Sequence, residues 1–200
     1  MKLVTFSVTN FRSITKAYKT PISDISILIG KNNEGKSNLL KALNIVMHAL
    51  RSYAQIRGVR RRIYSSYRNN ESDYFVWQRD FPISLQKRKS NTESVFRLEF
   101  ELTGDEITEF KNEIKSNLNG TLPIEIKIGK NAEPQVSVIK KGRGSKTLNL
   151  KSKKIAEYIA NRIYFNYIPA IRTDQQAMEV VDRVMSAELA KLEGQDAYEK

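Results

Sequence analysis

The sequence predicts an α/β fold in which a mixed sheet surrounds one helix, with an antiparallel β subdomain beside it. Three patterns support this prediction. Residues 25–29 form a nearly continuous apolar run, which is typical of a strand buried on both faces. From Leu39 to Leu50, apolar residues recur every three to four positions, which indicates one face of a helix. Residues 94–102 alternate between apolar and polar side chains, which predicts a strand with one solvent-facing side.

The first part of the chain is predicted to begin with a hairpin. Residues 2–10 are rich in β-branched and aromatic side chains and fit a strand. Residues 12–20 can form its partner strand, and Pro21 ends the pattern. After the helix, residues 57–72 are expected to be irregular, because they contain a glycine and a pair of asparagines.

The second half of the chain is predicted to alternate between helices and short strands. Thr103 and Glu106 form a potential capping box, which predicts a helix to about residue 118. Ser152 can cap a short helix to residue 160, and Thr173 with Gln176 can cap another that ends near residue 192. Short strands are expected at residues 123–128, 135–139, 147–150 and 163–168.

The composition excludes several classes of protein. The 200-residue chain has no cysteine and one histidine, His48, so disulfides, cysteine-based zinc sites and histidine-rich metal sites are ruled out. No apolar stretch is long enough to cross a membrane, and the N-terminus has no apolar signal segment, so a cytoplasmic protein is expected. The net charge of +12 indicates a partner that carries phosphates.

The loop between the predicted strand and the helix carries a phosphate-binding motif. Residues 30–37 read Gly-Lys-Asn-Asn-Glu-Gly-Lys-Ser and fit G-x-x-x-x-G-K-[ST], in the strand-loop-helix context that this motif requires. Gly30 and Gly35 allow turns that direct successive backbone N–H groups at phosphate oxygens. Lys36 can reach the β- and γ-phosphates, and the Ser37 hydroxyl can ligate Mg²⁺. The sequence therefore predicts ATP and Mg²⁺ as cofactors.

Segments at both ends of the chain resemble one branch of the ABC-type ATPases. Asn10-Phe11-Arg12-Ser13, followed by the segment from Ile27 to Leu40, resembles the N-terminal lobe of the ATPase head in RecF and structural-maintenance-of-chromosomes (SMC) proteins. Residues 167–172, Tyr-Ile-Pro-Ala-Ile-Arg, resemble the OLD (overcoming lysogenization defect) family. That family includes the nuclease of the Gabija anti-phage system and related ATPase subunits of bacterial defence systems. The resemblance implies a P-loop NTPase fold of the ABC type.

The resemblance also implies roles for residues outside the motif. In this branch the arginine after the N-terminal strand lies near the nucleotide, which nominates Arg12; alternatively, Arg12 is a surface arginine in a turn. A glutamine after a core strand helps hold Mg²⁺ and the attacking water, and Gln175 or Gln176 can fill that role or simply begin the next helix. The expected nucleotide-binding residues are Gly30, Lys31, Asn32, Asn33, Glu34, Gly35, Lys36, Ser37, Asn38 and Arg12, with Ser37, Gln175 and Gln176 at the metal.

Other parts of such an ATPase are missing from this sequence. We find no apolar run followed by Asp-Glu to activate water, no Ser-Gly-Gly-type signature, and no carboxylate cluster of a Toprim nuclease domain. We therefore interpret residues 1–200 as the N-terminal part of a longer protein, with a basic insertion at about 51–90 and a helical region beginning at about 174. This part is expected to contain no catalytic residue and to be inactive alone.

Basic residues concentrate in two segments. In the first, arginines alternate with tyrosines, a pattern suited to phosphate contacts and base stacking. The alternatives are a solvated loop and a docking face for an acidic partner. The candidate nucleic-acid-binding residues are Arg57, Arg60, Arg61, Arg62, Arg68, Lys87, Arg88 and Lys89. The second segment, residues 140–154, is interpreted as a hairpin edge protected by lysines.

These features predict an ATP-binding domain whose role depends on the rest of the protein. The leading hypothesis is a nucleotide-gated DNA nuclease, or its ATPase subunit, in anti-phage defence. Its heads would form a homodimer or higher oligomer and could bind a partner protein of the defence system. One alternative is a RecF-like DNA-repair ATPase without a nuclease. Another is a scaffold that senses a nucleotide without hydrolysing it.

Overall fold

The computed structural model describes residues 1–30, 35–54, 74–90, 92–139, 145–168 and 185–186. The chain divides into two units, Met1–Arg57 with Arg68–Tyr164, and Gly58–Tyr67 with Phe165–Lys200. All helices and strands whose bounds are given below lie in the first unit.

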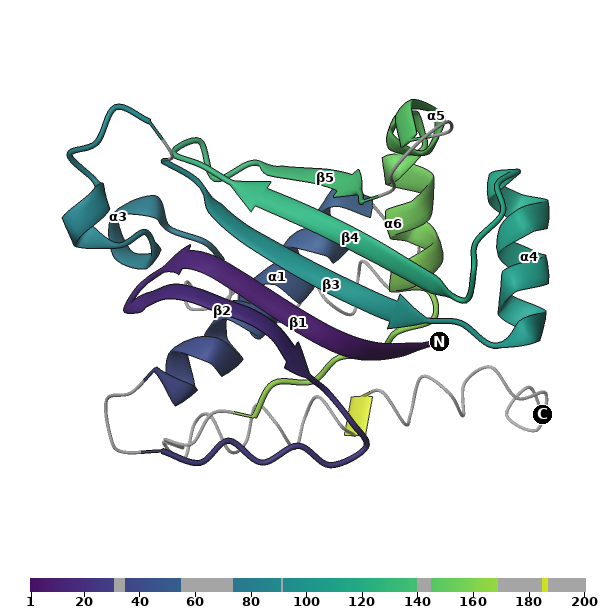
Figure 1. Ribbon diagram of the computed structural model, residues 1–200, viewed down its shortest axis with the longest axis horizontal. Coiled ribbons are helices and arrows are strands. Elements are labelled where there is room, and N and C mark those ends of the chain that lie inside the picture. Colours follow the sequence, from purple (N-terminus) through teal and green to yellow (C-terminus); the bar gives the residue numbers. More distant parts are fainter. Residues whose placement is uncertain (31–34, 55–73, 91, 140–144, 169–184, 187–200) are drawn as a thin grey trace. The chain divides into compact units, whose positions relative to one another are not determined.

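A five-stranded antiparallel sheet forms the centre of the first unit (Figure 1). Its strands are β1 (Lys2–Phe11), β2 (Ile14–Pro21), β3 (Ser94–Glu101), β4 (Thr121–Ile128) and β5 (Pro134–Val138), in the order β2-β1-β3-β4-β5. Phe96, Leu98 and Phe100 of β3 are buried on one face, whereas Arg97 and Glu101 on the other face are exposed. The predictions of strands at residues 2–10, 12–20, 94–102, 123–128 and 135–139 are therefore confirmed.

Two helices pack on the apolar face of the sheet. Helix α1 (Lys36–Ala54) contacts β1 and β5, and helix α6 (Ser152–Ala160) contacts β5 and α1 (Figure 1). The Tyr53 and Ser152 hydroxyls lie 2.8 Å apart and link the two helices. Arg51 donates a hydrogen bond to the carbonyl of Ile163 at 3.1 Å, which fixes the chain leaving α6 to α1. The helices predicted to follow Lys36 and to end at residue 160 are confirmed, but the predicted cap by Ser152 is wrong: the N-cap residue of α6 is Lys151, with no side-chain hydrogen bond.

Helix α4 (Gly104–Ile114) begins at the predicted capping box. The Thr103 hydroxyl accepts from the Glu106 N–H, and the Glu106 carboxylate accepts from the Thr103 N–H. The helix ends at Ile114 rather than near residue 118, because Lys115 adopts a left-handed conformation with φ 56°.

Three predicted strands are wrong. Residues 25–29 form no strand, and Ile25, Ile27 and Ile29 are 81%, 77% and 90% exposed, because no described strand pairs with this run. Residues 147–150 belong to helix α5 (Ser145–Leu150), where the Asn149 side chain accepts a hydrogen bond from the Val138 N–H at 2.8 Å. Residues 163–168 have no regular structure. All strand pairs in the described sheet are antiparallel, so the mixed sheet is not seen there.

The second basic segment is also corrected where the structure describes it. Residues 145–150 form α5 and residues 152–154 begin α6, so this part of the segment forms no hairpin edge. Lys151 and Lys154 donate hydrogen bonds to the carbonyls of Ile114, at 2.6 Å, and Glu113, at 3.0 Å. These carbonyls end α4, where a cation is favoured by the helix dipole, so the two lysines stabilise that helix terminus.

We expect Thr103→Ala to destabilise the protein by about 1 kcal/mol, because the Glu106 N–H loses its acceptor. Urea unfolding should show a lower midpoint with an unchanged slope. Thr108→Ala, an exposed change in the same helix, is the control and should alter stability by less than about 0.5 kcal/mol. Equal losses in the two variants would contradict a capping role.

Candidate nucleotide-binding site

The glycine-rich loop leads from the exposed run at 25–29 to the N-terminus of α1, and its residues 31–34 lie outside the described residues. Gly35 has φ +88°, a conformation that side chains disfavour, so the second glycine of the motif is required by the backbone. The Leu39 N–H donates to the Gly35 carbonyl at 2.8 Å and forms the first hydrogen bond of α1. Lys36 and Ser37 therefore occupy the first turn, where the helix carries its partial positive charge.

Lys36 folds back across the loop. Its ammonium group donates to the carbonyl of Gly30 at 2.6 Å, so the charge lies where the two ends of the loop approach each other. This contact is open to solvent. A phosphate group at the N-terminus of α1 would meet both the ammonium charge and the helix dipole.

A cleft of about 370 Å³ lies between the loop and the β1–β2 hairpin. This volume is within the roughly 300–1,000 Å³ of small-molecule sites. Two of its lining residues, Lys16 and Lys36, carry positive charge, and others are apolar. The lining residues are Ser13, Ile14, Thr15, Lys16, Ala17, Leu28, Ile29, Gly35, Lys36 and Leu39. The cleft can therefore accommodate a ligand that combines anionic and apolar groups.

The hairpin side of the cleft depends on a two-residue turn, Arg12–Ser13. Arg12 has φ +48°, which strains a residue with a side chain by roughly 1–3 kcal/mol. Its N–H donates to the carbonyl of Asp80 at 2.7 Å, which holds this conformation. Asn38 donates from its side chain to the Ser13 hydroxyl at 2.9 Å, which ties the turn to α1.

Asp80 is fully buried at the end of the single-turn helix α3 (Trp77–Asp80). Its carboxylate accepts hydrogen bonds from Arg12 Nε at 2.8 Å, from Arg79 Nε at 3.0 Å and Nη2 at 2.7 Å, and from the Val76 N–H at 2.9 Å. Arg12 Nη2 lies 2.7 Å from Asp80 Oδ1 in an ion pair. Burial alone would raise the pKa of Asp80, but the hydrogen bonds from Arg79, Val76 and Arg12 outweigh burial and lower that pKa. Asp80 is therefore ionised at neutral pH.

Sequence reasoning missed Asp80, because no motif marks it. The available signal was weak: an acidic residue in the basic segment, close to two aromatic residues. These are Trp77, which precedes Asp80 in the sequence, and Phe81, which follows it. Their rings stack with centroids 5.2 Å apart, and Phe81 is buried.

The structure brings together part of the predicted site. Gly30, Gly35, Lys36, Ser37 and Asn38 lie around the start of α1, and Arg12 lies in the turn that Asn38 contacts through Ser13. Lys87, Arg88 and Lys89 are exposed after the short 3-10 helix η2 (Ile83–Leu85). The other candidates, Lys31, Asn32, Asn33, Glu34, Arg57, Arg60, Arg61, Arg62, Arg68, Gln175 and Gln176, lie outside the described residues.

Comparison with known proteins identifies the family. The sequence model of the AAA ATPase domain matches residues 1–197. The chain belongs to the AAA ATPase domain family. The prediction of a P-loop ATPase is therefore confirmed. Among the described residues, no three His, Asp or Glu side chains group to hold a metal, and no helix is long and apolar enough to cross a membrane.

Two individual proteins are similar to this AAA ATPase domain. An uncharacterised protein of Methanocaldococcus jannaschii, MJECL44, is 48% identical over 44 residues, which is 22% of this chain and 13% of that protein. A solved structure from work on ATP-driven dimerisation and DNA-stimulated activation of SMC ATPases covers 92% of this chain and 99% of its own, with 11% identity and a TM-score of 0.42. The second likeness is distant.

We expect Asp80 to make stability depend on pH. Because its folded pKa is below the unfolded value of about 3.9, its contribution is fully present above about pH 4 and is lost as the pH falls through the folded pKa. Urea unfolding of the wild type and Asp80→Asn should differ most near neutral pH, and the difference should shrink below about pH 4. A difference that stays constant down to pH 3 would exclude this linkage.

Proposed function

We propose that residues 30–38 bind the phosphates of ATP, with Mg²⁺ held by the Ser37 hydroxyl. The observation that carries this proposal is the cleft at the start of α1, with the Lys36 ammonium group beside the loop that precedes the helix. Lys36 and Lys16 supply charge for the phosphates, and Ile14, Leu28 and Leu39 supply apolar surface for the base. Membership of the AAA ATPase domain family and the lining of the cleft both support a nucleotide as the ligand.

The residues present fit a magnesium nucleotide. Ser37 is exposed in the first turn of α1, next to Lys36, so its hydroxyl is accessible to a metal bound to phosphate oxygens. Mg²⁺ would neutralise charge that develops on the phosphates during hydrolysis. The chain's own contribution is to bind and orient: Lys36 and the dipole of α1 fix the phosphates.

For the whole protein, we propose a nucleotide-gated DNA nuclease or its ATPase subunit in anti-phage defence, working as a dimer or higher oligomer. This is supported by the resemblance of residues 167–172 to the OLD family and by the net charge of +12. A RecF-like repair ATPase and a non-hydrolysing nucleotide sensor are the alternatives. Assays of ATP turnover and DNA cleavage by the complete protein separate all three.

Replacing Lys36 tests the nucleotide site. Lys36→Ala removes the charge beside the loop and should weaken ATP binding at least tenfold, or about 1.4 kcal/mol, in calorimetry of the complete protein. Ser37→Ala should weaken binding more with Mg²⁺ than without it. Lys111→Ala, an exposed lysine on α4, is the charge-matched control and should leave the affinity unchanged. Unchanged binding by Lys36→Ala would refute the proposed site.

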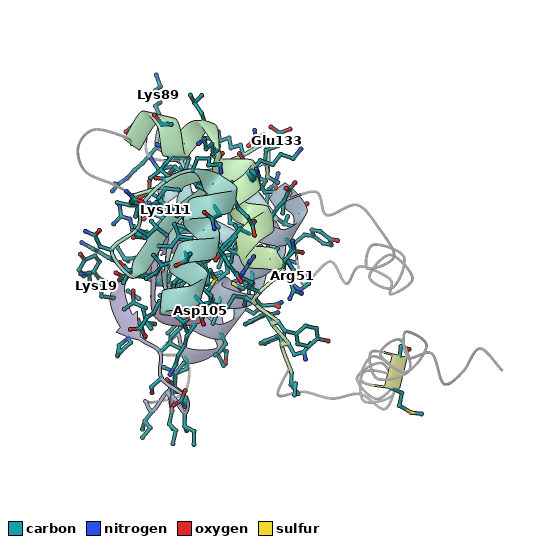
Figure 2. The ribbon with its side chains drawn as sticks, turned by 90° about the vertical axis from the view of Figure 1, so that its right-hand side faces the viewer. Lys19, Arg51, Lys89, Asp105, Lys111 and Glu133 are labelled. Carbon is teal, nitrogen blue, oxygen red and sulfur yellow. The ribbon has the colours of Figure 1, made fainter. Side chains whose placement is uncertain are left out.

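The exposed residues Lys87, Arg88 and Lys89 offer a test of DNA binding, and Figure 2 shows Lys89 projecting outward. Changing all three to Gln should make the slope of log affinity against log salt shallower by up to about 2.7 on duplex DNA, since each phosphate contact contributes about 0.9. A control with the same charge change replaces Lys111, Lys115 and Lys153, which are also exposed. Equal slopes in the wild type and both variants would exclude DNA contacts by this triplet.

A further inference from the structure

We propose that Asp80 is a positioning residue of the nucleotide site, which holds the Arg12–Ser13 turn in the conformation that completes the cleft. The proposal deepens the proposed function and rests on it, because the cleft matters only if it binds the nucleotide. Asp80 does not line the cleft. It acts through the hairpin turn, and three steps of contact connect it with the loop.

The first step joins Asp80 to Arg12. Arg12 Nε donates to Asp80 Oδ1 at 2.8 Å, and Nη2 lies 2.7 Å from the same oxygen in an ion pair. The Arg12 backbone N–H donates to the Asp80 carbonyl at 2.7 Å. The side chain and the backbone of Arg12 are thus fixed by one residue. This double attachment stabilises the strained φ of +48° that the turn needs.

The second and third steps lead from the turn to the loop. Ser13 follows Arg12 directly and lines the cleft, and its hydroxyl accepts from Asn38 in the first turns of α1 at 2.9 Å. A Cβ on Gly35 would lie 3.6 Å from both the Ser13 hydroxyl and the Ile14 side chain, so the turn packs directly against the end of the loop. A shift of the turn therefore changes the cleft wall and its contact with the loop.

Two other roles for Asp80 fit the structure less well. A general base needs a free lone pair, but this carboxylate has about four acceptor sites and already accepts four hydrogen bonds. An ordinary structural ion pair needs one cation, which Arg79 supplies through two contacts of its own. The second arginine at Asp80 is the one that carries the cleft turn.

The test is ATP affinity of Asp80→Asn in the complete protein, at a temperature where circular dichroism shows it folded. Loss of a negative charge alone would strengthen binding of an anion, whereas loss of positioning should weaken it about tenfold. The sign of the change therefore separates the two effects. Asp24→Asn makes the same charge change at an exposed residue and should not weaken binding.

A second control separates positioning from general loss of stability. Tyr158→Phe removes the hydrogen bond from a buried hydroxyl to the Glu106 carbonyl, between α6 and α4, and should lower Tm without changing ATP affinity. Arg12→Gln should weaken binding as Asp80→Asn does. The double variant should lose no more than the larger single loss, because both changes break one connection.

These variants distinguish failure of the proposed nucleotide site from failure of the positioning role of Asp80. If Lys36→Ala binds ATP normally, the proposed site itself is wrong. If Lys36→Ala loses affinity but Asp80→Asn binds as well as the wild type or better, only the positioning role is overturned. Additive losses in the Arg12→Gln, Asp80→Asn double variant also overturn it. Should Asp80→Asn fail to fold, Asp80→Glu keeps the charge but displaces the guanidinium group, and the same comparison of affinity decides.

Discussion

The geometry of the cleft depends on one buried carboxylate. Asp80 reaches the β1–β2 turn from a segment 68 residues further along the chain, through its bond with Arg12. Removing a charge from water is unfavourable, and here two arginines and a backbone N–H compensate for it. Because these donors come from separate segments, the carboxylate can be satisfied only when the hairpin and α3 are docked together.

The sheet supports this arrangement from the other side. Its apolar face receives α1, so the position of the loop is set by the packing of residues such as Ile45, Val46 and Leu50 against the core. Burying each of these side chains contributes about 1.5–3 kcal/mol. The cleft is thus held between a helix fixed by hydrophobic packing and a hairpin turn fixed by an ion pair.

Sequence patterns predicted the antiparallel strands and most of the described helices, because the spacing of apolar residues indicates which face of a strand or helix is buried. These patterns failed at residues 25–29 and 163–168. An apolar run favours a buried strand, but it does not identify the neighbouring strand that would pair with it and bury it. At residues 147–150, four residues were too few to distinguish a strand from a helix. Tertiary contacts, such as the hydrogen bond from the Val138 N–H to the Asn149 side chain, accompany the helix that forms there. The glycine-rich motif was recognisable because its chemistry is local, whereas Asp80 acts only through contacts distant in sequence.

The end of the exposed run at 25–29 forms a third side of the cleft. Gly30 follows Ile29 directly and receives the hydrogen bond of Lys36, and Leu28 and Ile29 line the cleft. The α1 side and the hairpin side of the cleft are fixed by packing and hydrogen bonds, but no described strand pairs with this third side. The cleft thus joins three segments that are held in different ways: α1 by packing in the core, the hairpin turn by the ion pair of Arg12 with Asp80, and Gly30 by its hydrogen bond with Lys36.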